Sequence, residues 1–561
     1  MAFFSRVAVA VLALLPGGRS LAQKPSPVTF EERAASAGLD FAHFNGRSGE
    51  FFYVESMGGG VCLFDHDGDG WLDIYLVNGA ALPGSSTGGG ATNALYRNRT
   101  DGTFQDVTAG TGVGDPSYST GACAADYDND GDVDLYVLNF GPDVLYRNDG
   151  DGTFTDVTAE AGLSSSGWSV AGAFLDYDRD GHLDLFVGRY LKYTLDDNRP
   201  CRRQAGGTLI RDYCGPDAAP GLSDLLFRNL GDGRFVEVSA RVGIAGKPGK
   251  AMGVGAADYD GDGWPDLFVA NDQMRNYLYR NVRGERFEEG ALLAGVAFDD
   301  GGGVQASMGV AWGDVDNDGH LDLFVPCLER EVFPLYRNEG DGFFSDVSRR
   351  SGIAAATLPH TGFGAILADF DDDGWLDALT SNGAVFAREG TRPGTDSFRD
   401  CYGETALLLH NEAGRRFRDI SAVASGYFRD RRVGRGAACG DLFNDGRISV
   451  VISNNGGRPA LLRNTTPRRA DRHWLTVRVI GRKSNRDGIG ARITVLAGGR
   501  RYLREVAAGG SVFSQNDSRP HFGLGEAARA ERIDIVWPSG IRQTLRDVRV
   551  DRVLTVTEPE G

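Results

Sequence analysis

Past residue 22, the sequence contains no apolar run that approaches the 18 residues of a membrane-spanning helix. Amphipathic helical periodicity is also missing, which excludes a helical bundle. Histidine is sparse, at 8 of 561 residues, and no segment has the pattern of a zinc metalloprotease, a serine-hydrolase elbow or a phosphate-binding loop. The net charge of −18 argues against nucleic acid as a partner. Motifs therefore identify no candidate catalytic residue.

The one long apolar stretch lies at the N-terminus and has the form of a cleavable signal peptide. Arg6 precedes an apolar run over residues 7–15, and Ser20 and Ala22 give a small-x-small cleavage pattern before Gln23. The run is too short to span a bilayer. We therefore predict a signal peptide over residues 1–22, cut near Ala22/Gln23, and a secreted or periplasmic protein without a transmembrane segment.

Glycine is the residue in excess, with 80 copies alongside 10% aromatic and 41% hydrophobic residues. This composition is typical of short strands joined by tight turns and is too hydrophobic for a disordered chain. Much of the aspartate falls in a nine-residue repeat, with Asp at positions 1, 3, 5 and 9 and Gly at position 6. Six complete copies and a degenerate seventh begin at Asp65, Asp126, Asp176, Asp258, Asp314, Asp369 and Asp441.

A second repeat, a Leu-aromatic-Arg-Asn turn followed by a short strand, comes after each acidic loop. Clear copies begin at Leu95, Leu145, Leu226, Leu278 and Leu335, and weaker ones at Leu408 and Leu461. Each unit reads as four strands, which is one propeller blade. The last unit lacks its final strand, but residues 29–33 resemble one. We predict an all-β fold, with a seven-bladed β-propeller over residues 23–466 closed by its N-terminal strand.

The acidic loops have the chemistry of a calcium site. Side-chain oxygens at positions 1, 3, 5 and 9 and the main-chain carbonyl at position 7 suit Ca²⁺. Zn²⁺ would need His or Cys ligands, and Mg²⁺ is the second choice because it prefers a strict octahedron. An EF-hand would need Glu at position 12, where this chain has apolar strand residues. The predicted ligands are Asp65, Asp67, Asp69, Trp71, Asp73, Asp126, Asp128, Asp130, Asp132, Asp134, Asp176, Asp178, Asp180, His182, Asp184, Asp258, Asp260, Asp262, Trp264, Asp266, Asp314, Asp316, Asp318, His320, Asp322, Asp369, Asp371, Asp373, Trp375 and Asp377.

About six structural Ca²⁺ ions are expected, because four clustered carboxylates repel one another unless a cation lies between them. The seventh loop has Phe443 at position 3 and Ser449 at position 9, so we expect no ion there. A catalytic metal needs an open coordination position. These loops offer a nearly closed oxygen shell, and we expect the ions to stabilise the fold without taking part in chemistry.

The C-terminal part of the chain, residues 467–561, is also predicted to be all-β. Residues 474–479 and 532–536 alternate between apolar and polar side chains. Gly-Gly pairs at 498–499 and 509–510 mark turns. We predict a small, sandwich-like β-domain.

All seven cysteines follow the predicted cleavage site, and export permits disulfides. Cys201 and Cys214 share one inserted loop and are the favoured pair. Cys327 and Cys401 are a candidate pair across neighbouring blades. Buried free thiols are expected at the remaining three positions, Cys62, Cys123 and Cys439.

The repeats resemble the FG-GAP/VCBS repeats of integrin α-subunit propellers, and the chain as a whole resembles the cartilage acidic protein family, as a bacterial-type member. The supporting segments lie at residues 41–46, 55–60, 213–216 and 433–436. The tail resembles the ASPIC/UnbV domain that ends such proteins, in segments 484–491, 514–517, 521–525 and 537–540. The resemblance implies a propeller followed by this domain, and it says little about function.

Two insertions, at about residues 192–221 and 386–405, follow the second strand of their blades and should lie on the ring face opposite the acidic loops. Loops on a rigid scaffold often carry recognition, although these could also be tolerated decoration. His43 and Glu55 are candidates for polar chemistry, with hydrogen bonding inside the fold as the favoured alternative. The histidines inside acidic loops are expected to be solvated: His66, His182 and His320.

Two functions fit this reading. The first is an exported calcium-binding recognition or adhesion module for an extracellular protein or glycan. The alternative is an extracellular polysaccharide hydrolase or lyase with its site in the funnel at the ring centre; a purely structural matrix protein is a third possibility. A deep funnel with converging His, Glu and Arg would favour the enzyme, and a shallow one would favour the binding module.

Overall fold

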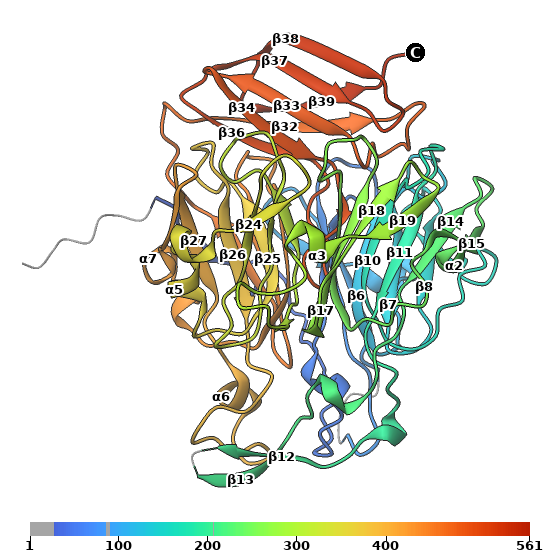
Figure 1. Ribbon diagram of the computed structural model, residues 1–561, viewed down its shortest axis with the longest axis vertical. Helices are drawn as coiled ribbons and strands as arrows, with labels where there is room; N and C mark the ends of the chain where they lie inside the picture. The colour runs from blue at the N-terminus through green and yellow to red at the C-terminus, as the bar shows by residue number, and fades with distance from the viewer. Residues whose placement is uncertain (1–26, 86–89, 206, 561) are drawn as a thin grey trace, which may run out of the picture.

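The computed structural model describes residues 27–85, 90–205 and 207–560, so the predicted signal peptide lies outside the described residues. Seven antiparallel blades of four strands surround a common axis, and a two-sheet domain lies across one face of the ring (Figure 1). The prediction of an all-β propeller is confirmed. None of the helices in the described part of the chain has the length and apolar character needed to cross a membrane.

Within each blade, the strands run in chain order from the axis outward. Blades 1 to 3 consist of β2 (Val61–Phe64), β3 (Asp73–Leu76), β4 (Ala94–Asn98) and β5 (Phe104–Asp106); β6 (Ser119–Ala125), β7 (Asp134–Asn139), β8 (Val144–Asn148) and β9 (Phe154–Asp156); and β10 (Ser169–Leu175), β11 (Asp184–Arg189), β14 (Leu225–Asn229) and β15 (Phe235–Glu237). Blades 4 to 6 consist of β16 (Ala251–Ala257), β17 (Asp266–Met274), β18 (Tyr277–Val282) and β19 (Arg286–Glu289); β21 (Ala311–Gly313), β22 (Asp322–Phe324), β23 (Leu335–Asn338) and β24 (Phe344–Asp346); and β25 (Gly362–Ala368), β26 (Asp377–Asn382), β27 (Leu407–Glu412) and β28 (Arg416–Asp419).

Blade 7 is completed by the N-terminal strand, as predicted. It contains β29 (Gly434–Gly440), β30 (Ser449–Asn454), β31 (Ala460–Asn464) and β1 (Phe30–Glu32). Phe30 pairs with Asn464 in the antiparallel register of β1 and β31. Each innermost strand contacts the next one around the axis, and β29 contacts β2, so the ring is closed. The apolar cores lie between neighbouring blades, where both faces of each sheet are buried.

Short helices and one extra strand decorate the ring. One-turn helices follow the outer strands of most blades: α1 (Thr108–Thr111), α2 (Ser239–Val242), α3 (Ala291–Ala294), α4 (Ser348–Ser351) with α5 (Ile353–Thr357), and α7 (Ser421–Ala424). In addition, β20 (Gln305–Ala306) pairs with β17.

The C-terminal domain consists of two sheets around an apolar core. One sheet has the order β36 (His521–Gly525), β32 (His473–Ile480), β39 (Arg552–Thr557), and the other has the order β34 (Arg500–Glu505), β33 (Arg492–Ala497), β37 (Arg529–Val536), β38 (Arg542–Arg549). Val477, Ile535 and Trp537 are buried between them. The predicted sandwich-like arrangement is present, and the domain is docked on the ring with β38 as the strand farthest from it (Figure 1).

A segment of this domain, residues 508–517, runs into the centre of the propeller; we call it the axial segment. Its short strand β35 (Ala508–Gly509) pairs with β10 of blade 3. Hydrogen bonds or bridges then join it to the innermost strand, or the residue just before it, in each of the other six blades. Five of these contacts are between main chains, at Val61, Ala122, Gly253, Val310 and Cys439, and in the sixth the Ala365 N–H donates to the Ser511 hydroxyl. The axis is therefore filled by protein, an arrangement that the sequence analysis did not predict.

The two insertions pack together on the opposite face, and we call them the cap (Figure 1). The first contains β12 (Cys201–Ala205) and β13 (Thr208–Asp212), and the second contains α6 (Phe398–Tyr402). The buried Asp212 joins them: it accepts hydrogen bonds from the Tyr402 hydroxyl at 2.7 Å and from the Ala387 N–H at 2.8 Å. The predicted placement opposite the acidic loops therefore agrees with the structure.

The cysteines bear out one predicted pair and overturn the other. Cys201 and Cys214 form a disulfide within the cap. Cys327 and Cys401 are both free and buried, so the candidate pairing between them is wrong. Cys327 instead lies against the hydroxyl of Ser307, and Cys401 lies in the apolar cluster of the cap. The three predicted buried free thiols are confirmed: Cys62, Cys123 and Cys439.

Candidate metal centre

The six complete acidic loops recur at one place in six blades, on the ring face under the C-terminal domain. Each loop joins the innermost strand of a blade to its second strand, so buried strands fix both of its ends. In blade 2, for example, β6 ends at Ala125, and β7 begins at Asp134, which is position 9 of the loop. The ring thus presents the predicted metal residues in a repeated frame.

Within a loop, the carboxylates converge on one point. Ligand oxygens of Asp126, Asp128 and Asp134 lie within 4.8 Å of one another, and so do three carboxylates in each of the first and third loops. The glycine at position 6 permits the tight turn; Gly131 has a φ of 107°, which side chains rarely adopt. Predicted ligands that are up to eight residues apart in sequence are thereby brought together.

Position 7 is held against position 5 in all six loops. In each of them, its main-chain N–H donates a hydrogen bond of 2.9–3.0 Å to the position-5 carboxylate, at Trp71, Asp132, His182, Trp264, His320 and Trp375. The six side chains at this position differ widely, so the shared contact belongs to the main chain; the role of the position-7 carbonyl as a metal ligand stays a prediction.

The position-9 aspartate ties the loop to the rest of its blade. The Asp184 carboxylate accepts one hydrogen bond from the Tyr177 N–H, at 3.0 Å, and one from the Asn229 N–H, at 2.9 Å. Tyr177 is position 2 of the same loop, and Asn229 ends the third strand, β14. This carboxylate is fully buried, and both of its oxygens are oriented before any ion binds.

Several loop oxygens are buried and have no hydrogen-bond partner within the described residues. They belong to five of the six loops, at Asp65, Asp67, Asp178, Asp258, Asp316, Asp371 and Asp377. Burial also raises the pKa of Asp126 to about 8 and those of Asp176 and Asp314 to about 7. Unpartnered buried carboxylates are costly unless a cation joins them, and an all-oxygen donor set suits a hard divalent ion. The loops therefore fit Ca²⁺.

Arginines from the second repeat lie beside the acidic loops, a role that the sequence analysis missed. Arg228 contacts Asp178 at 2.6 Å and Asp180 at 2.7 Å. Arg97 and Arg280 make equivalent contacts with Asp67 and Asp260. The recurrence of Arg directly before Asn in the turn motif was the available signal. These guanidiniums reduce the repulsion within a loop while leaving other carboxylate oxygens free for an ion.

The asparagine of the same turn motif clamps neighbouring blades together. In blade 3, the Asn229 side-chain amide donates to the Leu183 carbonyl of its own loop and to the Tyr127 carbonyl of the preceding loop. The same pair of bonds occurs in all seven blades, at Asn98, Asn148, Asn229, Asn281, Asn338, Asn411 and Asn464. Loop geometry and blade-to-blade contact are therefore coupled around the ring.

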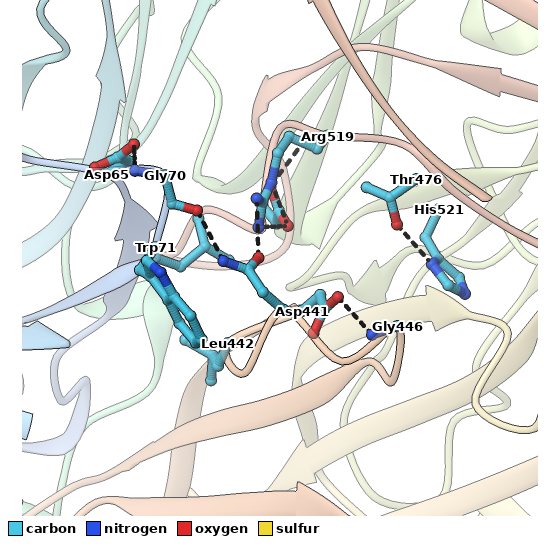
Figure 2. A network of polar contacts seen from close by, with 12 residues as sticks. Asp65, Gly70, Trp71, Asp441, Leu442, Gly446, Thr476, Arg519 and His521 are labelled. Carbon is cyan, nitrogen blue, oxygen red and sulfur yellow. Dashed lines mark hydrogen bonds and ion pairs between the residues drawn. The ribbon is translucent and has the colours of Figure 1, made fainter. Parts of the chain in front are cut away.

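The degenerate seventh loop keeps the backbone of the others but surrounds its acids with arginine. The Asp441 carboxylate accepts the Gly446 N–H at 2.7 Å, as position 1 does elsewhere (Figure 2). Asp445 pairs with Arg447 at 3.2 Å, and Arg463 lies over the ring of Phe443. Among the buried oxygens without a partner in the described chain, none belongs to this loop.

The C-terminal domain adds a further positively charged side chain, Arg519, at the seventh loop. Arg519 is half-buried and donates to Asn444, whose own amide donates to the carbonyl of Gly70 in the first loop (Figure 2). Nearby, His521 bonds Thr476 and, through its other ring nitrogen, Asp372 of the sixth loop at 3.0 Å. The prediction that no ion occupies the seventh loop stays a prediction, with these contacts in its favour.

The domain also reaches other loops of the ring. Arg492 contacts the Asp258 carboxylate at 2.8 Å, and Asp487 accepts the Asp126 N–H at 2.8 Å. Because the axial segment fills the ring centre on this face, the funnel proposed for an enzyme site is occupied there by protein.

The histidines within the loops differ from the expectation that they would be solvated. His66 is buried and bonded to the position-9 carboxylate of Asp73, so the prediction for His66 is wrong. His182 and His320 are half-buried; His182 lies 3.3 Å from the side-chain nitrogen of Asn129 in the neighbouring loop. His66 is held by its own loop, whereas His182 packs against the adjacent loop, a contact that sequence spacing does not reveal.

His43 and Glu55 both lie buried near the axis on the cap side. Glu55 accepts hydrogen bonds from Ser48 and, at 2.9 Å, from the Tyr213 hydroxyl of the cap. Burial lowers the pKa of His43 to about 3, and its Nδ1 accepts the Gly456 N–H. These bonds support the structural alternative: Glu55 holds the cap to the ring, and His43 is bonded to the connection between β30 and β31 of blade 7.

Comparisons with known proteins bear on this architecture. The "FG-GAP-like repeat" family model matches residues 65–137, 126–187, 218–269 and 258–325, and the "ASPIC and UnbV" model matches residues 481–561. Cartilage acidic protein 1 of Mus musculus is 26% identical over 360 residues, which cover 61% of this chain and 51% of that protein. The Homo sapiens protein of the same name is 28% identical over 186 residues, which cover 31% and 26%. The chain thus spans a quarter to a half of these relatives.

Solved structures give weaker matches. An Agrocybe aegerita lectin that recognises non-reducing terminal N-acetylglucosamine has a TM-score of 0.38 at 15% identity and covers 71% of this chain and 85% of its own. The rhamnogalacturonan lyase YesW has a TM-score of 0.36 at 13% identity and covers 73% and 72%. Both scores lie below 0.5 and are too low to bear on what this chain does.

Proposed function

We propose that this chain is an exported calcium-binding β-propeller that serves as a recognition module. It is a member of the cartilage acidic protein family, with FG-GAP-like repeats and an ASPIC and UnbV domain. Export rests on the N-terminal sequence. The carrying observation for calcium is the set of buried loop oxygens that have no partner in the described chain. The ions would hold the fold, since each loop offers a nearly closed shell of oxygens.

Calorimetric titration of the chelated protein with Ca²⁺ tests the metal proposal. Close to six sites are expected, and thermal unfolding should move to higher temperature as they fill, because an ion that binds only the folded chain stabilises it. Two sites or fewer, or an unchanged melting temperature in excess chelator, would refute the proposal.

Recognition is proposed to take place at the cap. Its two insertions are joined by Asp212, braced by a disulfide, and held to the ring by the bond from Tyr213 to Glu55. Leu209 on β13 is 54% exposed, which places a large apolar side chain on an otherwise polar hairpin. A protein or glycan ligand would meet a rigid, preorganised surface here.

A glycan and protein binding screen, with and without Ca²⁺, tests this assignment. Leu209→Asp on the cap should weaken binding of any ligand found. Leu293→Asp in α3 is the matched control, because Leu293 is 80% exposed on a different part of the ring. Equal effects of the two substitutions, or binding that survives deletion of both insertions, would remove the cap from the account.

The enzyme alternative receives no support from the axis. The axial segment fills the channel on the loop face, and the hollow beneath the cap is lined mainly by apolar side chains, with Asp272 as its carboxylate. The convergence of His, Glu and Arg that would favour a hydrolase or lyase is not what lines this hollow, so the recognition function is the better supported of the two.

A further inference from the structure

The C-terminal domain is basic, whereas the ring is acidic. Residues 467–561 contain 18 Lys and Arg against 11 Asp and Glu, a net charge of +7 within a chain of −18. Part of this excess faces the acidic loops: Arg492 contacts Asp258, Arg504 lies near Asp314, and Arg519 lies near Asp441. Complementarity with the ring accounts for these arginines, but not for those on the opposite side of the domain.

Five of the other arginines lie on the two strands farthest from the ring, β37 and β38 (Figure 1). Along β38, Arg542, Arg546 and Arg549 are exposed, while the apolar side chains between them are half-buried against the core. A regular pleat would place Arg546 and Arg549 on opposite faces. Asp547, whose φ is +55°, interrupts the alternation, so that all three arginines point away from the core.

The neighbouring strand is irregular at the same level. In β37, outward-facing and buried residues alternate as far as Glu531. The next residue, Arg532, also faces outward instead of inward, and it lies opposite Arg546, next to Asp547. In the pair of strands, Arg529 faces Arg549 and Arg532 faces Arg546. Like charges directly opposite one another destabilise a sheet. The surface therefore concentrates positive charge at some cost to the domain.

Internal carboxylates neutralise only part of this charge. Arg529 pairs with Asp547 at 2.8 Å and Arg532 with Asp534 at 2.7 Å, and both arginines are about half exposed, so these pairs contribute little. No carboxylate of the described residues pairs with the other three, Arg542, Arg546 and Arg549. In the same row across the sheet as Arg532 and Arg546, exposed Arg501 on β34 likewise has no carboxylate partner in the described chain.

We propose that this arginine face, formed by Arg501, Arg529, Arg532, Arg542, Arg546 and Arg549, binds a linear acidic polysaccharide. The charges run along an edge strand for about 24 Å, at roughly 3.4 Å per residue, which suits an extended polyanion. Membrane insertion or base stacking would use large exposed hydrophobic side chains. Among the described residues, all such side chains belong to the propeller and none to the C-terminal domain, which favours a polysaccharide over a membrane or a nucleic acid. Blunting an edge strand against aggregation needs fewer charges and no opposed pairs.

Binding of the full mature protein to dextran sulfate, with neutral dextran as the comparison, tests the proposal at fixed free Ca²⁺. The triple variant Arg542→Glu, Arg546→Glu, Arg549→Glu should weaken binding to dextran sulfate by roughly tenfold or more, and added salt should weaken the wild type. The control carries the same change of charge at exposed propeller arginines whose side chains make no hydrogen bond or ion pair with the described part of the chain: Arg99→Glu, Arg283→Glu, Arg415→Glu. It should bind like the wild type.

A second measurement does not depend on folding of the variant. In the wild-type protein, dextran sulfate should protect Arg542, Arg546 and Arg549 from modification by phenylglyoxal, and neutral dextran should not. Anionic phospholipid vesicles and duplex DNA serve as competitors.

The proposal is overturned by equal binding to both dextrans, by equal losses in the two triple variants, by protection elsewhere, or by tighter binding of vesicles or DNA. It is also overturned if the face mediates only salt-dependent self-association. Failure here leaves the cap assignment untouched, because Leu209→Asp probes a different surface.

Discussion

Position 5 of the acidic loop offers a matched test of the metal sites. Asp180 in blade 3 pairs with Arg228, and Asp445 in the seventh loop pairs with Arg447 and, at 3.7 Å, with Arg463, so Asn at either position removes the ion pairing of a position-5 carboxylate. Asp180→Asn should also remove one Ca²⁺ site. At free Ca²⁺ about a hundred times Kd, the loss is about 2–3 kcal/mol of unfolding free energy.

Asp445→Asn should cost less than about 1 kcal/mol, the value of a partly exposed ion pair, and should leave the number of bound ions unchanged. Calcium titration and denaturant unfolding measure both quantities. Equal losses in the two variants would mean that the third-blade loop holds no ion.

The ring of asparagines predicts a large effect from a small truncation. Asn229→Ala leaves the Leu183 and Tyr127 carbonyls buried without a donor. Each unsatisfied carbonyl costs about 1–3 kcal/mol, so unfolding free energy should fall by about 2–6 kcal/mol. Denaturant unfolding in saturating Ca²⁺ measures the loss. A change within about 0.5 kcal/mol would show that water replaces the clamp.

At the scale of single residues, the sequence predicts the acidic loops but not the residues that they contact. Spacing alone places the carboxylates, because six copies share one frame and a nine-residue turn determines its own geometry. The clamp carbonyls, such as the His66 carbonyl that accepts from Asn148, could not be predicted, since they depend on how one blade meets the next. Contacts of that kind join residues about 80 positions apart, and no local pattern records them.

The inner strands predict how the axial segment is accommodated. A Cβ on Gly60 would lie 1.8 Å from the carbonyl oxygen of Phe513, whereas a Cβ on Gly110 would meet nothing within 4 Å. Gly60→Ala should therefore destabilise the protein by about 2 kcal/mol or more, through overpacking. Gly110→Ala, in α1, should be neutral or slightly stabilising.

Thermal unfolding and limited proteolysis between β31 and β32 together measure the effect of Gly60→Ala. Faster cleavage there is expected, because expulsion of the axial segment loosens the C-terminal domain. If Gly60→Ala and Gly110→Ala behave alike, the segment is not tightly held at the axis.

Elements of the ring were predictable because they repeat. The strand order, the closing strand β1 and the face of the cap all follow from the position of each segment within its unit. Gly60 and Gly436 make room for the axial segment, since a Cβ on them would meet Phe513 and Ser514 respectively. That segment could not be foreseen, since its sequence reads as a Gly-Gly turn of a separate domain.

The whole molecule should respond to pH and calcium together. In the chelated chain, burial raises the pKa of Asp126 to about 8 and that of Asp176 to about 7. A raised pKa means that the folded chain binds the proton more tightly than the unfolded chain. This contribution to stability is therefore complete below about pH 4 and is lost as the pH rises through 7 to 8.

Ca²⁺ replaces those protons, so the increase in melting temperature that it brings should grow between about pH 5 and about pH 8.5. Scanning calorimetry at matched ionic strength, with chelator or with saturating Ca²⁺, gives the difference at each pH. An increment that is constant or falls over this range would contradict the proposed occupancy of these loops.

The closing strand has a consequence for how the protein is made. β1 is synthesised first, yet its partner β31 follows more than 400 residues later. Until then β1 of the nascent chain has no strand to pair with. The ribosome completes β31 only shortly before it makes the axial segment. Long-range strand pairing of this kind is slow and leaves unpaired strand edges that are prone to aggregation. Export across a membrane in an unfolded state would delay the pairing of β1 with β31 until the whole polypeptide has been translocated.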